Sequence, residues 1–292
     1  MSVLEVHNIT KRFPGTLALD NVSASFESGK VHALVGKNGS GKSTLMKIIS
    51  GAYTADEGEI IYDGQTMKFK DPMSAAAQGI ATVYQELSLV PTMSVTENIL
   101  MGRMPKKGKL IDWKSAKKQV KELLKELEID IDPDKNVEEL SMWQRQMVEI
   151  AKAMSFNPKV LQFDEPTSSL ASHEVEMLFQ MIRRLKEKGV IITYVSHKLQ
   201  ELWEIADTCT VIRDGKVMMR DTSKKELIQM MFGDVEVQQR PDDLMRSDEV
   251  IMEVKHLSRK NKFKDISFQL KKGEVLGIAG MIEIFVLSLF LH

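Results

Sequence analysis

The stretch from Gly36 to Thr44 constrains this chain more than any other, because it fits the pattern G-x-x-x-x-G-K-[ST]. The run 31–35 before it predicts a buried parallel strand, and residues 45–49 after it continue as a helix. A loop that follows a strand and opens a helix is the context in which this pattern binds phosphate. The sequence therefore predicts a phosphate-binding loop on an α/β framework.

The residue types in this loop match that chemistry. Glycines allow the backbone to turn successive N–H groups toward an anion, and the helix N-terminus adds partial positive charge. Lys42 supplies a full charge for the β- and γ-phosphates, and the Ser43 hydroxyl is placed for Mg²⁺. The residues expected to bind the nucleotide are Gly36, Asn38, Gly39, Ser40, Gly41, Lys42, Ser43 and Thr44.

A second group of candidate residues follows another apolar run, at 160–163. An Asp at a strand end, here Asp164, can hold Mg²⁺, and an adjacent Glu, here Glu165, can polarise the attacking water. Gln162 is a polar residue inside this predicted buried strand, and the sequence gives no reason for it.

The charge composition bears on which classes of partner the chain can bind. The 292 residues carry 40 basic and 41 acidic side chains, so the formal net charge is −1. This balance does not predict the sustained basic surface of a nucleic-acid binder, and we expect no nucleic-acid partner. Cys209 is the single cysteine, which excludes an intrachain disulfide and fits a reducing cytoplasm.

The chain is expected to contain two copies of one pattern. Residues 1–235 form a first domain, with a helical subdomain at about 94–158 that begins at the capping box Ser94–Glu97. In that subdomain, Asp112 caps a helix with one apolar face, formed by Trp113, Ala116, Val120, Leu123, Leu124 and Leu127. Residues 236–248 read as a linker, and 249–280 repeat the opening of the first domain. The apolar stretch 281–292 resembles no part of the first domain.

With these residues in place, the chain resembles the ATP-binding-cassette ATPases from its start to about Gly280. Phe13 matches the aromatic that stacks on adenine, Gln85 the Q-loop glutamine, and Asp164–Thr167 the Walker B segment. Leu140–Gln144 lies at the family's signature segment, and His197 matches the switch histidine. The resemblance implies a P-loop NTPase fold, with a mixed sheet flanked by helices, an antiparallel β subdomain and an inserted helical subdomain.

The resemblance also implies site roles. Glu165, His197 and Gln85 would be catalytic; Ser43, Gln85 and Asp164 would hold Mg²⁺; and Phe13 and the loop would hold ATP. Ser141 and Gln144 would serve the ATP of a second cassette. Met142 and Trp143 replace the two glycines of the signature segment, and in a homodimer we expect Trp143 to face the phosphate and weaken pairing.

Beyond these motifs, the duplicated cassette makes the chain resemble the ATPase subunits of bacterial monosaccharide importers. The resemblance implies that this chain is cut short within its second cassette. The implied partners are membrane-spanning permease subunits, a second cassette and, indirectly, a sugar-binding protein. The implied location is cytoplasmic, peripheral on the inner face of the membrane. Two alternatives are a soluble ribosome-acting ATPase, which a short linker argues against, and a fragment that binds nucleotide but hydrolyses it weakly.

Overall fold

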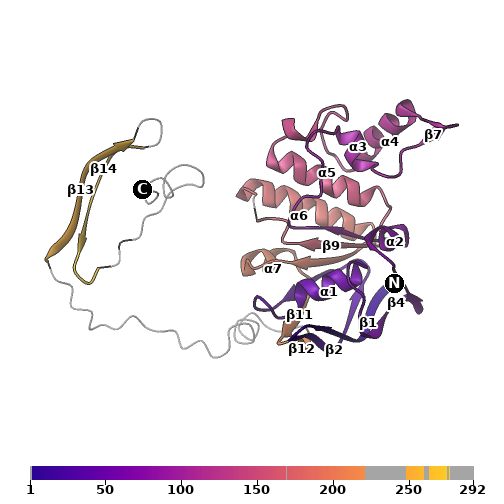
Figure 1. Ribbon diagram of the computed structural model, residues 1–292, viewed down its shortest axis with the longest axis horizontal. Coiled ribbons are helices and arrows are strands. Elements are labelled where there is room, and N and C mark those ends of the chain that lie inside the picture. Colours follow the sequence, from indigo (N-terminus) through magenta and orange to yellow (C-terminus); the bar gives the residue numbers. More distant parts are fainter. Residues whose placement is uncertain (1, 169, 221–247, 260–262, 275, 277–292) are drawn as a thin grey trace. The chain divides into compact units, whose positions relative to one another are not determined.

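The computed structural model describes residues 2–168, 170–220, 248–259, 263–274 and 276. The chain divides into two units, Met1–Asp234 and Val235–His292, and each is described by itself (Figure 1). The expected linker, 236–248, lies outside the described residues except for Asp248, and the stretch 281–292 lies wholly outside them. Within the described residues, no helix is long and apolar enough to cross a bilayer.

A six-stranded sheet forms the centre of the first unit. Its strands are, in spatial order, β12 (Lys216–Arg220), β11 (Thr208–Arg213), β3 (Val31–Val35), β10 (Ile191–Val195), β9 (Val160–Asp164) and β6 (Ile80–Val83). Neighbouring strands are parallel except for the β11–β12 hairpin, so the expected mixed sheet is confirmed. Because β3, β10 and β9 are adjacent and parallel, the segments that follow them meet at one edge of the sheet.

A second, antiparallel sheet packs beside the first. Its strands are, in spatial order, β2 (Thr16–Glu27), β1 (Val3–Phe13), β4 (Glu57–Tyr62) and β5 (Gln65–Met67). Leu4 and Phe26 from this sheet join Leu45 of α1 (Lys42–Ile49) and Leu34 of β3 in one buried cluster. The helix that follows the phosphate loop is thus fixed by apolar contacts with both sheets. The expected antiparallel β subdomain is present.

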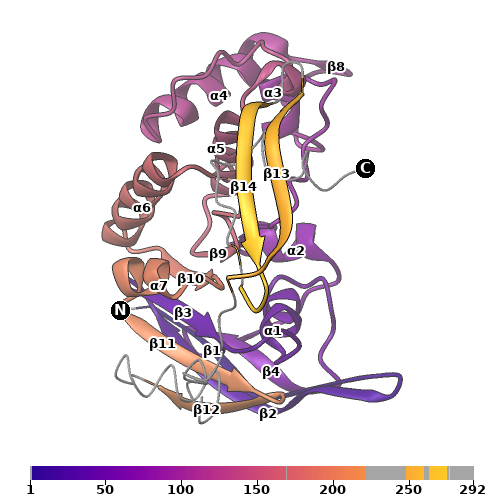
Figure 2. The same ribbon diagram turned by 90° about the vertical axis from the view of Figure 1, so that its left-hand side faces the viewer.

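Helices cover the remaining faces. Outside the 94–158 region these are α2 (Pro72–Ala77), α6 (Ser172–Glu187) and α7 (Leu199–Ile205). Inside it are α3 (Val95–Ile99), α4 (Trp113–Glu126), the 3₁₀ turn Val137–Glu139 and α5 (Met142–Met154), with a short hairpin of β7 (Lys106–Lys107) and β8 (Leu110–Ile111). Figures 1 and 2 show α3, α4 and α5 together at the end of this unit opposite β1 and β2.

The caps expected in this region are present, but one face was predicted wrongly. Ser94 and Asp112 accept hydrogen bonds from backbone N–H groups of α3 and α4, respectively. Ala116, Val120 and Leu124 of α4 are buried, whereas Trp113 is 44% exposed. A side chain at the first position of a helix points back beyond the helix N-terminus, and for this reason Trp113 does not share the buried face.

Gln162, unexplained in the sequence, belongs to a buried polar network. Its amide Nε2 donates to the Met46 sulfur at 3.2 Å, and its Oε1 accepts the Thr82 hydroxyl at 2.8 Å. The Thr193 hydroxyl lies 3.6 Å from the same sulfur. This network joins β6, β9 and β10 to α1, so the polar side chain is satisfied inside the core.

In the second unit, β13 (Val250–Arg259) and β14 (Phe263–Lys271) form an antiparallel hairpin that repeats the irregularities of β1–β2. Asn8 and His256 occupy matching positions with φ values of 51° and 50°, a left-handed conformation that Asn and His adopt more often than most other non-glycine residues. The backbone N–H of Asn8 donates to Ser23 Oγ, and that of His256 donates to Ser267 Oγ, both at 2.9 Å. The two hairpins therefore contain the same β-bulge.

Candidate nucleotide site

The phosphate loop lies between β3 and α1 and encloses its own lysine. The Lys42 side chain is buried, and its ammonium donates to the carbonyl oxygens of Gly36 at 2.8 Å and Lys37 at 3.0 Å. Ser43 is exposed in the first turn of α1, and Thr44 beside it is half-buried. The predicted charge and hydroxyl are thus both at the N-terminus of α1.

The loop's backbone tolerates no side chain at two of its glycines. A Cβ on Gly36 would lie 2.1 Å from the Ile212 carbonyl oxygen, and one on Gly41 would lie 2.7 Å from that of Ala18. Among the described residues, the Ser40 hydroxyl is buried without a hydrogen-bond partner. Packed glycines, an unsatisfied hydroxyl and a helix N-terminus fit a phosphate group. Asn38 and Gly39 are exposed at the tip of the loop.

The end of β9 places two carboxylates beside this loop. Asp164 is the last residue of the strand, and Glu165 follows it with a left-handed φ of 49°. The Glu165 backbone N–H donates to the Val195 carbonyl at 3.0 Å, which fixes the turn to the end of β10. Beyond β10, His197 Nε2 lies 2.6 Å from Glu165 Oε1. The structure thus brings together two of the three residues that were predicted to be catalytic.

The charges in this region influence one another. Burial lowers the pKa of the Lys42 ammonium, and the carboxylates of Glu165 and Asp164 oppose that effect. Burial raises the pKa of Asp164, the charge on Glu165 raises it further, and Lys47, Lys42 and His197 counteract both. The loop lysine and the strand-end carboxylates are therefore close enough for electrostatic coupling. Asp164 and Ser43 supply the carboxylate and hydroxyl oxygens that Mg²⁺ prefers.

Phe13, the residue predicted to stack on adenine, ends β1 and is half-buried. Its ring contacts that of Tyr53 edge-to-face, with centroids 5.5 Å apart. The Lys11 ammonium lies over Phe13, and that of Lys47 over Tyr53. Tyr53 was not predicted from the sequence. It follows α1 with no motif of its own, and only the fold brings it to Phe13.

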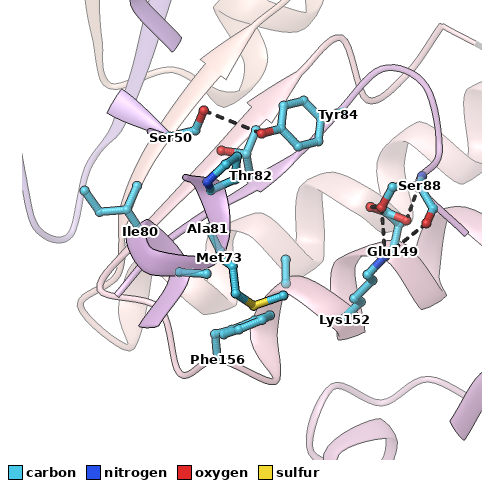
Figure 3. Close-up of a pocket in the computed structure, with 13 residues that line it drawn as sticks. Ser50, Met73, Ile80, Ala81, Thr82, Tyr84, Ser88, Glu149, Lys152 and Phe156 are labelled. Carbon is cyan, nitrogen blue, oxygen red and sulfur yellow. Dashed lines mark hydrogen bonds between the residues drawn. The ribbon is translucent and has the colours of Figure 1, made fainter. Parts of the chain in front are cut away.

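Gln85 is exposed just after β6, and the loop that follows it borders a pocket of about 160 Å³ (Figure 3). Ile80, Ala81 and Phe156 contribute apolar lining between β6 and α5. At the rim, the Ser88 hydroxyl donates to Glu149 Oε1 at 2.7 Å, and the Lys152 ammonium donates to Ser88 Oγ at 2.8 Å. The Gln85 loop is thereby fastened to α5.

The signature segment, Leu140–Gln144, begins α5. Ser141 is the N-cap: its hydroxyl accepts the Gln144 N–H at 3.2 Å, and Gln144 Oε1 accepts the Ser141 N–H at 3.0 Å. Within the described part of the chain, these two residues are paired with each other and not with the phosphate loop. Trp143 is half-buried against the main core cluster, whereas Met142 is 48% exposed. Of the two side chains that replace the signature glycines, Met142 is therefore the more exposed.

Comparison with known proteins agrees with this geometry. The family model of the ABC transporter matches residues 19–168, and the chain belongs to this family. The matched region includes the phosphate loop, Gln85, the signature segment and the strand-end carboxylates.

Three relatives illustrate the relationship. The chain is 44% identical to the galactose/methyl galactoside import ATP-binding protein MglA of Haemophilus influenzae, over 96% of this chain and 56% of that protein. It is also 44% identical to the ribose import ATP-binding protein RbsA 1 of Rubrobacter xylanophilus, over 96% of this chain and 57% of that protein. A nucleotide-free ATP-binding cassette from an ABC transporter superposes with a TM-score of 0.70 at 30% identity, over 82% of this chain and 98% of that one. The chain thus spans a little over half the length of the two import proteins.

Proposed function

We propose that this chain binds and hydrolyses MgATP as part of an ABC importer for monosaccharides. The observation that carries the proposal is the Glu165–His197 pair, in which Glu165 Oε1 lies 2.6 Å from His197 Nε2. The pair lies beside the phosphate loop, where the charge of Glu165 raises the pKa of Lys42 against the effect of burial. A carboxylate held in this way is placed to orient a water molecule toward a phosphate in the loop. The sugar class is inferred from the similarity to the two import proteins, which are named for galactose/methyl galactoside and for ribose.

In this proposal the nucleotide's phosphates lie against Lys42 and the backbone of Gly36–Gly41, and Phe13 contacts the base. Ser43 and Asp164 hold Mg²⁺, with Gln85 at the same metal and water. The metal supplies charge neutralisation on the phosphates. The chain's own residues provide a cradle of N–H groups, a buried ammonium and a carboxylate that accepts a hydrogen bond from water.

The second unit is proposed to begin a second cassette. It is supported by the shared β-bulge, and by Gly29 and Gly273, which follow their hairpins with φ values of 75° and 78°. In this arrangement, Ser141 and Gln144 would face the nucleotide of another cassette. The permease is proposed to contact the pocket between β6 and α5. The pocket's rim residue Ser88 lies on the loop that begins at Gln85, the residue that matches the family's Q-loop glutamine.

The test compares the unmutated chain with Glu165→Gln in two assays, binding of a fluorescent ATP analogue and release of phosphate. The variant should bind with unchanged affinity and lose about 10²–10⁴ in turnover, the range for a neutralised catalytic base. Equal turnover in both proteins would refute the role of Glu165. Deletion of the coding sequence should separately abolish uptake of labelled ribose or galactose, and unchanged uptake of both would refute the sugar assignment.

A further inference from the structure

Glu201, in the first turn of α7, holds a buried carboxylate between the loops that follow β9 and β10. Glu201 is 7% exposed, and three hydroxyl groups lie within hydrogen-bond distance of its carboxylate. Thr167 Oγ1 lies 2.9 Å from Oε1 and 2.7 Å from Oε2, Ser196 Oγ lies 2.9 Å from Oε2, and Tyr194 OH lies 3.1 Å from Oε2. The carboxylate accepts a hydrogen bond from each of the three hydroxyl groups, and the single Thr167 proton lies within reach of both carboxylate oxygens.

Two of the three donors lie close in sequence to the proposed hydrolytic pair. Thr167 is two residues after Glu165, and Ser196 immediately precedes His197. One carboxylate therefore fixes both loops at once. The Lys198 ammonium reinforces the link, since it lies 3.1 Å from Glu201 Oε1 and also donates to the Thr167 carbonyl oxygen at 3.1 Å.

The backbone conformation of Glu165 gives the bond between Thr167 and Glu201 its importance. A glutamate with a φ of 49° is in a sparsely populated conformation, which persists only where the surrounding contacts impose it. Besides the hydrogen bond within the turn, from the Ser168 N–H to the Glu165 carbonyl at 3.4 Å, two contacts tie it to other elements: the Glu165 N–H bond to Val195 and the Thr167 bond to Glu201. The first fixes the start of the turn and the second fixes its end.

We propose that Glu201 is a positioning residue for ATP hydrolysis, which keeps Glu165 and His197 within hydrogen-bond distance by binding Thr167 and Ser196. The proposal rests on the proposed function. Glu201 acts through these neighbours and does not itself reach the nucleotide. Small displacements of a reacting group lower turnover strongly while leaving ground-state binding intact. The role therefore predicts a loss in kcat without a matching change in KM.

The experiment compares Glu201→Ala and Glu201→Gln in the full chain with a matched control, Glu204→Ala. Glu204 lies on the same helix and its side chain is 52% exposed, in an ion pair with Arg183. Under conditions where near-ultraviolet circular dichroism shows each variant folded, Glu201→Ala should lower kcat about 10- to 100-fold, with KM for MgATP changed less than about twofold. Glu201→Gln, which keeps an acceptor oxygen, should recover part of the loss. Glu204→Ala should match the unmutated chain.

Hydrogen exchange supplies a readout that does not depend on turnover. In Glu201→Ala, amides of 165–168 and 196–198 should exchange faster, while those of α1 and β3 keep their protection. Unchanged kcat in Glu201→Ala, or faster exchange spread over the whole first unit, would overturn the positioning role. If the unmutated chain itself releases no phosphate, the proposed function fails, and the exchange pattern alone then decides whether Glu201 fixes the two loops.

Discussion

His197 Nε2 lies 2.6 Å from Glu165 Oε1, although 32 positions separate the two residues in the chain. The contact exists because β9 and β10 are adjacent parallel strands, so that the residues after them meet. His197 is 44% exposed at its side chain and Glu165 is 21% exposed. The pair is thus open to a substrate on the histidine side and fixed to the sheet on the other.

Replacement of this histidine tests what the pair contributes. His197→Ala should leave ATP affinity unchanged and lower turnover by about 10²-fold or more, because Glu165 loses the group that fixes its carboxylate. Equilibrium binding and phosphate release measure the two effects separately. His173→Ala, which changes an exposed histidine on α6, serves as the control and should retain full turnover. Loss of binding in His197→Ala would contradict the expected division of roles.

Lys42→Ala should nearly abolish MgATP binding. The ammonium is the buried positive charge of the phosphate loop, and removal of a charged partner from a buried site costs more than a neutral hydrogen bond does. Lys37→Ala changes an exposed lysine of the same loop and should shift affinity much less. Isothermal titration with MgATP distinguishes the two variants, and similar affinities would show that the backbone N–H groups alone hold the phosphates.

Stability should fall at acidic pH because of His32. Burial lowers the pKa of this imidazole, whose Nε2 accepts the Glu27 N–H at 2.7 Å. The unfolded chain then binds a proton that the folded chain rejects, so the stabilising contribution is complete above about pH 6.5 and declines below it. Urea unfolding of the unmutated chain and His32→Gln at several pH values measures this. The variant should lose less stability between neutral and acidic pH, and parallel losses would contradict the assignment.

The buried network around Gln162 should show strong coupling. Gln162→Leu removes the acceptor for the Thr82 hydroxyl and should lower the free energy of unfolding by about 1–3 kcal/mol. Adding Thr82→Val removes the stranded donor and should recover part of that loss, since a polar pair replaced on both sides costs less than one broken on one side. Urea denaturation of the two single variants and the double variant gives the coupling. Strict additivity would mean that the bond contributes nothing.

Hydrolysis by this chain alone should be slow and should rise more than linearly with protein concentration. The reason is that the proposed site is completed by the signature segment of another cassette, which excludes water and adds donors at the γ-phosphate. Met142→Gly should increase the activity, because Met142 is the exposed bulky side chain at the start of α5. Phosphate release measured from sub-micromolar to high micromolar protein tests both statements. Turnover per chain that is constant over this range would show that one cassette suffices.

Local patterns were sufficient for several individual elements, whereas the arrangement of the sheets was expected from the family resemblance. The strand, loop and helix around Lys42 and the caps at Ser94 and Asp112 depend on residues close in sequence, and all are present. Trp113 was placed wrongly because helical periodicity gives a direction around the axis but says nothing of whether another element covers the first turn.

Partners distant in sequence could not be predicted. Gln162 is compatible with the core only because Thr82 and Met46 are brought to it from two other elements. Tyr53 and Glu201 carry no motif, and their contacts with Phe13 and Thr167, which are distant in sequence, arise only from the fold. The roles in nucleotide binding and hydrolysis remain predictions for all the candidate residues, from Phe13 and the phosphate loop to Gln85, Ser141, Gln144, Asp164, Glu165 and His197.

The β1–β2 and β13–β14 hairpins share one bulge but differ in the chain that lies beyond it. Between the paired left-handed residues, the first hairpin runs from Asn8 to Asn21 and carries Phe13 at its tip, whereas the second runs only from His256 to Asp265. The bulge and its serine bond are the same in both hairpins, whereas the length of chain between the paired residues differs. If the two segments descend from a duplicated gene, the chain beyond the bulge was free to change length in one copy while the bulge kept its geometry, and any ligand contact that depends on that chain would differ between the two copies.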